Sequence, residues 1–115
     1  MSFGIIIPSY NEEKNIISLV NNIKNNSSPK FIVIIDDSKK SIKKYLIKKN
    51  IIYIHRKKKL GRGSAIILGI KTLIKNNVKN FIEMDADHSH DPLEIKQKIN
   101  IFFKKKLDLL IASRY

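Results

Sequence analysis

The stretch that decides the fold class is FIVIIDD, residues 31–37. Its apolar part is continuous rather than alternating and is rich in β-branched residues, which is typical of a strand buried on both faces of a parallel sheet. Two carboxylates follow this strand directly. Because both faces of such a strand must be covered, strands and helices should alternate along the rest of the chain.

Four further apolar runs are of the same kind, at residues 5–7, 51–54, 81–84 and 109–111. The segments between them carry apolar residues at helical spacing. These stripes are Ile16, Leu19, Val20 and Ile23, then Ile66, Ile70, Leu73 and Ile74, then Ile95, Ile99, Phe102 and Phe103. A shorter helix is expected over residues 41–49, with Ile42, Tyr45 and Leu46 as its apolar face. The order predicts one α/β domain over residues 1–115, with a doubly wound, mostly parallel sheet and helices on both faces.

Two of the expected helices have marked starts. Ser9 and Glu12 have the spacing of a capping box, and so do Asp91 and Glu94, with Pro92 at the first helical position. Helices should therefore begin just after the first strand and just after the fourth.

Asp85 and Asp87 lie one residue apart, directly after the fourth apolar run. On an extended backbone both side chains point to the same side, and two neighbouring negative charges favour a cation between them. Mg²⁺ typically binds one or two protein carboxylates and completes its shell with water and substrate phosphates. His88 and His90 could instead join them around a transition metal, but two acidic residues suit a hard cation better.

Polar residues follow all five strands, so they should meet in one crevice at the carboxyl ends of the sheet. This arrangement indicates a nucleotide-dependent enzyme. Each element also has a structural interpretation. A helix cap could be the whole role of Ser9, Asn11 and Glu12. The acidic pair at 36–37 could form a turn, and Gly-Arg-Gly at 61–63 could be a helix start rather than a phosphate cradle.

The net charge of +13 would attract polyanions, but dispersed lysines also reflect a composition crowded with Ile, Lys and Asn. A denser basic run covers residues 55–59. No nucleic-acid motif accompanies the charge, so we expect no nucleic-acid partner. The chain has no cysteine, no apolar run of membrane-spanning length and no secretory leader pattern, which predicts a cytoplasmic protein.

Five segments together resemble the family-2 glycosyltransferases with the GT-A fold, in particular the dolichyl-phosphate mannosyltransferases and their bacterial polyprenyl-phosphate relatives. The segments are residues 7–12 (IPSYNE), 35–38 (IDDS), 61–65 (GRGSA), 84–92 (MDADHSHDP) and 112–115 (ASRY). They occur in family order along essentially the whole chain. The resemblance covers the donor-binding half of the family, so we expect the chain to be truncated at its C-terminus.

The resemblance implies a role for each matching residue. Pro8, Tyr10, Glu12 and Asp37 would contact the nucleoside, and Asp85 would also belong to the nucleotide site. Mg²⁺ or Mn²⁺ would be bound by Asp85, Asp87 and Ser89. The catalytic residues would be Asp87 and Arg114, with Arg114 facing the phosphate of a lipid acceptor.

The expected function is metal-dependent, inverting transfer of mannose or glucose from a GDP-mannose or UDP-glucose type donor to a polyprenyl or dolichyl phosphate. A lipid acceptor would place the protein at the cytosolic face of a membrane, on the lipid surface or against a membrane protein. The alternative is a nucleotide-binding module, or a split subunit, without transfer activity of its own.

Overall fold

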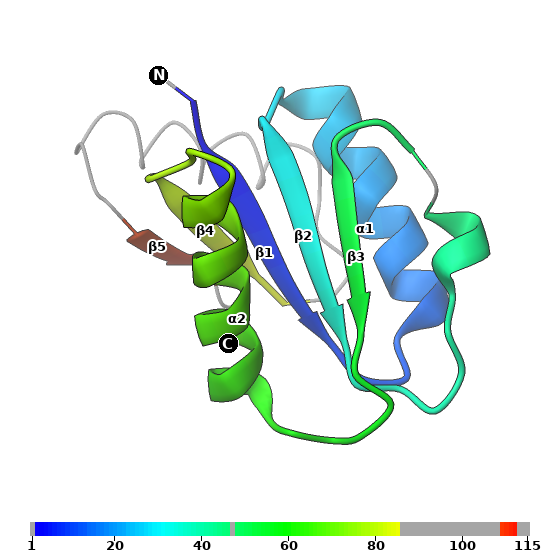
Figure 1. Cartoon of the computed structure of the whole chain (residues 1–115). Helices are drawn as coiled ribbons and strands as arrows, with labels where there is room; N and C mark the ends of the chain where they lie inside the picture. Colours follow the sequence, from blue (N-terminus) through cyan, green and yellow to red (C-terminus); the bar gives the residue numbers. More distant parts are fainter. Residues whose placement is uncertain (1, 47, 86–108, 113–115) are drawn as a thin grey trace.

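In the computed structural model, which describes residues 2–46, 48–85 and 109–112, five parallel strands form one sheet with the order β3-β2-β1-β4-β5 (Figure 1). The strands are β1 (Gly4–Ser9), β2 (Phe31–Asp36), β3 (Ile51–His55), β4 (Phe81–Met84) and β5 (Leu109–Ala112). All five expected strands are therefore present. The doubly wound α/β class predicted from the continuous apolar runs is confirmed.

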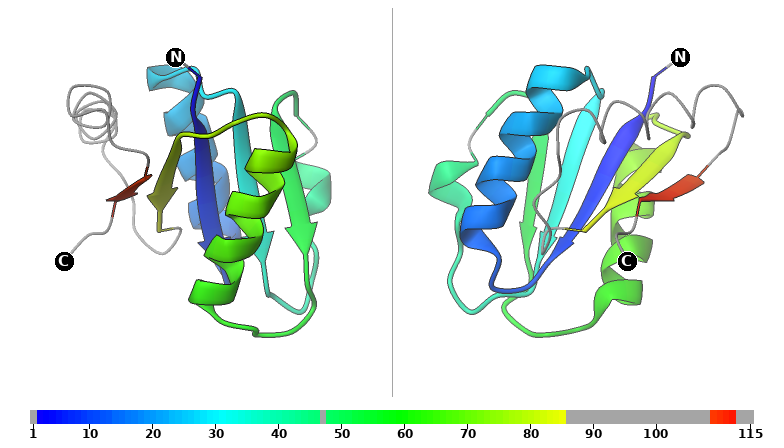
Figure 2. Two further views of the ribbon diagram at one scale, coloured as in Figure 1. Left: turned by 60° about the vertical axis from the view of Figure 1, so that its left-hand side comes forward. Right: turned by 180° about the vertical axis from the view of Figure 1, so that it is seen from behind.

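The helices α1 (Glu13–Asn26) and α2 (Arg62–Lys75) cover opposite faces of the sheet (Figure 2). Alternate strand residues divide between the two layers, because successive side chains point to opposite faces. Ile5, Ile7, Ile32 and Ile34 pack with α1, whereas Ile6, Val33 and Ile35 pack with α2. The predicted stripe on α1 is confirmed, since Ile16, Leu19, Val20 and Ile23 are all buried.

The prediction of a helix over residues 41–49 is wrong. Among the residues of this connection that the structure describes, the helical part is one 3-10 turn, η1 (Lys43–Tyr45). Ile42 and Leu46 are buried as expected, but Tyr45 is exposed. The backbone N–H of Ile42 donates to the hydroxyl of Tyr53 at 3.1 Å, and so short a segment gains little from helix formation alone. The helix expected from the stripe Ile95 to Phe103 lies outside the described residues, as does the capping box at Asp91.

The apolar face of α2 differs in part from the predicted stripe. Its buried residues are Ala65, Gly69 and Leu73, one turn apart, whereas Ile74 is exposed. Gly69 brings the helix close to the sheet, because a Cβ at this position would lie 2.5 Å from Cγ2 of Ile6. The buried face of α2 is therefore turned away from Ile74 and toward the small residues Ala65 and Gly69.

We expect Gly69→Ala to lower the free energy of unfolding by about 1–2 kcal/mol. Overpacking against the fully buried Ile6 should outweigh the gain in helix propensity of about 1 kcal/mol. Urea denaturation followed by circular dichroism measures the change. Gly63→Ala is the matched control, because it lies in the same helix with open space around its Cβ and should cause no loss. Equal stability of the two variants would contradict the close approach.

Candidate functional site

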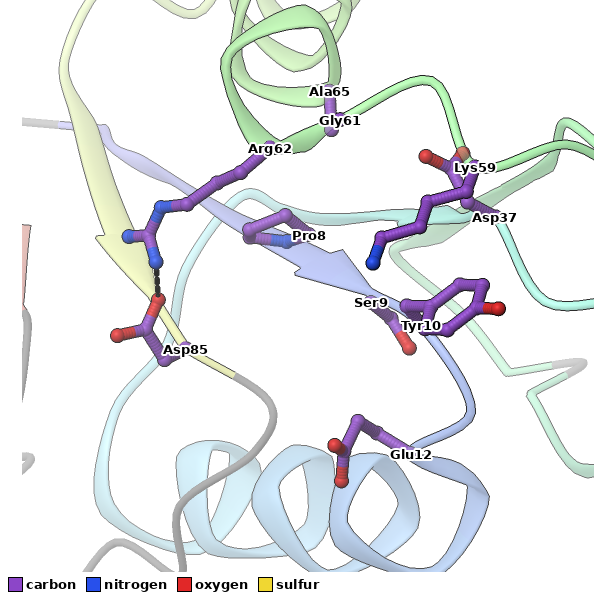
Figure 3. A pocket seen from close by; sticks show the side chains of 10 residues that line it. All are labelled: Pro8, Ser9, Tyr10, Glu12, Asp37, Lys59, Gly61, Arg62, Ala65 and Asp85. Atoms are coloured by element: carbon purple, nitrogen blue, oxygen red, sulfur yellow. Dashed lines mark hydrogen bonds and ion pairs between the residues drawn. The ribbon is translucent and has the colours of Figure 1, made fainter.

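A pocket of about 290 Å³ lies at the carboxyl edge of the sheet (Figure 3). Residues that follow β1, β2, β3 and β4 contribute to it, as expected for an open parallel sheet. Its lining comprises Pro8, Ser9, Tyr10, Glu12, Asp37, Lys59, Gly61, Arg62, Ala65 and Asp85. The structure thus brings together five residues that the sequence nominated: Pro8, Tyr10, Glu12, Asp37 and Asp85.

The other nominated residues, Asp87, Ser89 and Arg114, lie outside the described residues. His88 and His90 do so as well. The roles that the family resemblance implies for them stay predictions.

The turn between β1 and α1 differs from the expected capping box. Ser9 remains in the strand, where its carbonyl oxygen accepts from the backbone N–H of Asp37 at 3.0 Å. Asn11 adopts a left-handed conformation with φ 55°, and α1 begins at Glu13 without a side-chain cap. Strand pairing therefore keeps Ser9 from capping the helix. Its buried hydroxyl has no hydrogen-bond partner among the described residues, and it borders the pocket.

The two adjacent acidic residues, Asp36 and Asp37, have different roles in the structure. Asp36 is buried and holds neighbouring loops together, because it accepts from the hydroxyl of Ser38 at 2.5 Å and from the hydroxyl of Tyr53 at 2.6 Å. The same Ser38 hydroxyl accepts from the backbone N–H of Asn11 at 2.6 Å. Burial and the hydrogen bond to Asp36 raise the pKa of Tyr53. Asp36 therefore braces the turn that carries Tyr10, whereas Asp37 lines the pocket.

Asp37 is bound bidentately by Arg56. Nε of Arg56 donates to Oδ1 at 2.5 Å and Nη2 donates to Oδ2 at 2.8 Å, while the backbone N–H of Leu60 donates to Oδ2 at 3.0 Å. Burial alone would raise the pKa of Asp37, but these donors and the charge of Arg56 outweigh it and lower the pKa below its usual value. The carboxylate consequently stays ionised at neutral pH.

The basic run after β3 supplies cations to the rim of the pocket. Arg56 also donates to the hydroxyl of Ser64 at 2.8 Å, which ties β3 to the start of α2. The ammonium of Lys59 lies 4.9 Å from the centre of the Tyr10 ring. The sequence placed this basic run after the third strand, among the residues expected to meet in the crevice, but it did not single out Lys59 as a site residue.

Arg62 pairs with two buried carboxylates on β4 and just after it. Its guanidinium forms ion pairs with Glu83 and Asp85, whose side chains are only 5% and 9% exposed. The sequence missed this arrangement, although Glu83 interrupts an otherwise apolar run. A cation thus already lies against Asp85, and carboxylate oxygens suit hard divalent ions. Among the described residues, no three acidic or histidine side chains gather closely enough to bind a metal.

The Gly-Arg-Gly segment at 61–63 forms a turn and a helix start. Gly61 precedes α2 with φ 95°, and no side chain caps the helix there. Gly61, Arg62 and Ala65, at the start of this 14-residue helix, line the pocket, and its first turn has backbone N–H groups without an intrahelical partner. Such a terminus favours anions, so the phosphate-cradle interpretation stays a prediction that this geometry supports.

A parallel sheet with acidic and basic side chains around a pocket at its carboxyl edge is typical of nucleotide-binding α/β domains. The particular family follows from sequence comparison. The chain belongs to glycosyl transferase family 2, whose family model matches residues 4–115.

Several curated relatives resemble the chain over nearly its full length. It is 33% identical over all of its residues to a dolichol-phosphate mannosyltransferase from Pyrococcus furiosus, of which the match covers 34%. It is 29% identical, over 96% of its length, to a polyprenol monophosphomannose synthase from Mycolicibacterium smegmatis, and the match covers 44% of that protein. It is also 29% identical, over 96% of its length, to a UDP-N-acetylglucosamine–dolichyl-phosphate N-acetylglucosaminyltransferase from Methanococcus voltae, of which the match covers 51%. The chain thus spans about half the length of these relatives or less.

A solved structure has the same fold. It is glucosyl-3-phosphoglycerate synthase from Mycobacterium tuberculosis in complex with Mn²⁺, uridine diphosphate and phosphoglyceric acid. The TM-score is 0.64, with 18% sequence identity, and the match covers 86% of the present chain and 38% of the other. This likeness supports the GT-A type of α/β fold.

Proposed function

We propose that this chain provides the donor side of a glycosyltransferase that moves a hexose from a nucleotide-sugar to a polyprenyl or dolichyl phosphate. The observation that carries the proposal is the pocket where Tyr10, Asp37 and Asp85 meet basic groups and the start of α2. The relatives are named for transfer to dolichyl or polyprenyl phosphates, which supports the acceptor class.

The nucleoside would bind between the first two strand ends. Tyr10 offers an exposed ring for stacking, and Pro8, Glu12 and Asp37 line the same pocket. The diphosphate would lie toward the start of α2, where uncapped N–H groups and the charge of Lys59 favour anions.

Asp85, with Asp87 and Ser89 beyond the described residues, would hold Mg²⁺ or Mn²⁺. A divalent ion bound there would supply charge neutralisation to the diphosphate leaving group. The buried position of Asp85 and its attraction for the Arg62 guanidinium support a cation at this point. A related fold has been crystallised with Mn²⁺.

The proposed reaction is a single displacement with inversion. An oxygen of the acceptor phosphate forms a bond to the anomeric carbon, and the bond from that carbon to the donor phosphate oxygen breaks, with its electron pair leaving on the nucleoside diphosphate. The acceptor phosphate is already ionised at neutral pH, so no general base is required. Arg114 is proposed to face this phosphate and orient it.

A lipid acceptor implies work at a membrane surface, and we propose a peripheral location on the cytosolic face. Within the described residues, no helix is both long enough and apolar enough to span a bilayer. Lys57, Lys58 and Lys59 are exposed beside the pocket. Such a basic rim would be attracted to anionic lipid, at about 1 kcal/mol for each lysine near the surface.

Calorimetry with nucleotide-sugars tests the donor site. We expect binding that requires Mg²⁺ or Mn²⁺ and that is at least about tenfold weaker in the double variant Asp85→Asn with Asp87→Asn, because the metal bridges protein and diphosphate. Glu13→Gln is the control, since it removes an exposed carboxylate outside the pocket and should bind like the wild type. Unchanged binding by the double variant would refute the metal site.

The second candidate is donor binding without transfer. It is favoured by the coverage of the relatives, since more than half of the Pyrococcus and Mycolicibacterium proteins lies outside the match. A radiolabelled nucleotide-sugar and polyprenyl phosphate distinguish the two candidates: product formed by the chain alone supports transfer, and binding without product supports the module.

A further inference from the structure

We infer that the outward face of α2 docks on a bilayer that contains anionic lipid. This face is centred on Ile67, Lys71 and Ile74, and we call it the α2 outer face. The inference takes the lipid surface from the proposed function and goes further by naming the part of the protein that meets it. It follows from exposed apolar side chains, from the charge around them and from the contrast with α1.

Two isoleucines of α2 are exposed to solvent, Ile67 by 57% and Ile74 by 54%. At 3.6 residues per turn, they and Lys71 lie within about 60° of one another on the helix, on the side opposite Gly69, which packs on the sheet. Leu60, just before the helix, is 53% exposed. Among the described residues, these three are the large aliphatic side chains that face solvent.

The charge around these side chains has one sign. Residues 55–82 contain no aspartate or glutamate and eight cationic residues, which are Arg56, Lys57, Lys58, Lys59, Arg62, Lys71, Lys75 and Lys79. Exposed isoleucines next to lysines are typical of helices that lie in a lipid interface. The stem of a lysine contacts apolar surface while its ammonium reaches toward phosphate. The α2 outer face therefore has both groups that such an interface requires.

The helix on the opposite face of the sheet provides an internal comparison. Like α2, α1 has 14 residues and is rich in isoleucine, leucine and valine. Its exposed residues are nevertheless all polar, namely Glu13, Lys14, Ser18, Asn21, Lys24 and Asn25. A composition rich in isoleucine therefore does not by itself bring isoleucine to the solvent side of a helix. The comparison favours a function for the α2 outer face.

Charge and size decide which occupant fits this face. A second copy of the chain would bring cations against cations, which repel each other. A stable protein interface typically buries about 800 Å² on each partner, around an apolar core larger than three aliphatic side chains. An anionic bilayer complements the charge and requires only shallow insertion of such side chains. The basic run at 57–59 continues the same charge to the rim of the pocket, where a lipid phosphate would arrive.

Co-sedimentation of the full chain with vesicles of equimolar phosphatidylcholine and phosphatidylglycerol tests the apolar contribution. We expect Ile67→Ser with Ile74→Ser to bind at least about fivefold more weakly than the wild type, because the inserted apolar area is lost. Tyr45→Ser is the control, since it removes an exposed apolar side chain from η1 and should change binding by less than about twofold. Circular dichroism verifies that each variant is folded.

A second pair of variants tests whether the charges of α2 act locally. Lys71→Gln with Lys75→Gln should weaken vesicle binding at least about tenfold. Lys14→Gln with Lys30→Gln removes the same charge from exposed positions elsewhere and should weaken it less than about threefold. Equal losses in the two pairs, or unchanged binding by the double isoleucine variant, would overturn the inference, because net charge alone would then explain lipid binding. Absence of binding by the wild type would also overturn it and favour a protein as the occupant.

Calorimetry with nucleotide-sugars on the same α2 variants separates this inference from the proposed donor site. Ile67, Lys71, Ile74 and Lys75 lie outside the pocket lining, so these variants should bind the donor like the wild type. Vesicle binding through α2 without donor binding would refute the donor site and leave the membrane surface standing. Donor binding without vesicle binding through α2 would refute the membrane surface alone.

Discussion

Replacing Arg62 with methionine is expected to lower the free energy of unfolding by about 3 kcal/mol. The substitution leaves Glu83 and Asp85 buried without their shared counter-ion, and removing one partner of a buried ion pair typically costs about 3–5 kcal/mol. The lower end applies because Arg62 itself is 47% exposed. Urea denaturation monitored by circular dichroism gives the value.

Two further variants make this expectation specific. Lys71→Met removes an exposed cation from the same helix and should change stability by less than about 0.5 kcal/mol. The double variant Arg62→Met with Glu83→Met removes one of the two buried charges and should recover part of the loss, because Asp85 still lacks the guanidinium of Arg62. If Arg62→Met were as stable as Lys71→Met, the carboxylates would not depend on Arg62.

Replacing Asp36 with alanine is expected to cost about 3 kcal/mol as well. Asp36 is 1% exposed and accepts from the backbone N–H of Ser38 at 3.0 Å, from its hydroxyl, and from the hydroxyl of Tyr53. Each buried donor left unpaired costs about 1–3 kcal/mol. Denaturation midpoints and slopes, measured as for Arg62, report the loss.

A double-mutant cycle separates the contact with Tyr53 from the rest. Tyr53→Phe alone should cost about 1 kcal/mol, and Asp36→Ala should cost less in that background than in the wild type. Tyr45→Phe is the control, since this tyrosine is exposed and should lose almost nothing. Strict additivity of Asp36→Ala and Tyr53→Phe would show that their hydroxyl–carboxylate contact contributes no stability.

The sheet could be predicted from the sequence because short, continuous runs of β-branched residues, separated by helical patterns, are typical of buried parallel strands. The face of α1 was equally predictable, because its four apolar residues recur at helical spacing. The face of α2 was predictable only in part. Leu73 is buried and Ile66 and Ile70 pack against the core as expected, but the pattern of isoleucines hides the small residues Ala65 and Gly69, which decide how closely the helix approaches Ile6.

Part of the pocket lining could also be predicted, because it follows from the order of the strands. Tyr10, Asp37 and Asp85 follow strands, and topology alone places strand ends together. The pairs Arg56–Asp37 and Arg62–Glu83 could not be predicted, because long side chains choose partners that are distant in sequence and the choice depends on packing. The residue that interrupted a buried run, Glu83, was the one available signal.

The strand order also determines when the central strand can find both of its partners as the chain is synthesised. β1 lies in the centre and pairs with β2 on one side, from Gly4 opposite Phe31, and with β4 on the other, from Gly4 opposite Phe81. During translation, β1, β2 and β3 leave the ribosome well before β4, so one edge of the central strand waits without a partner. Bare apolar edges invite pairing with other chains. The nascent protein is therefore most exposed to aggregation in the interval before residues 81–84 emerge.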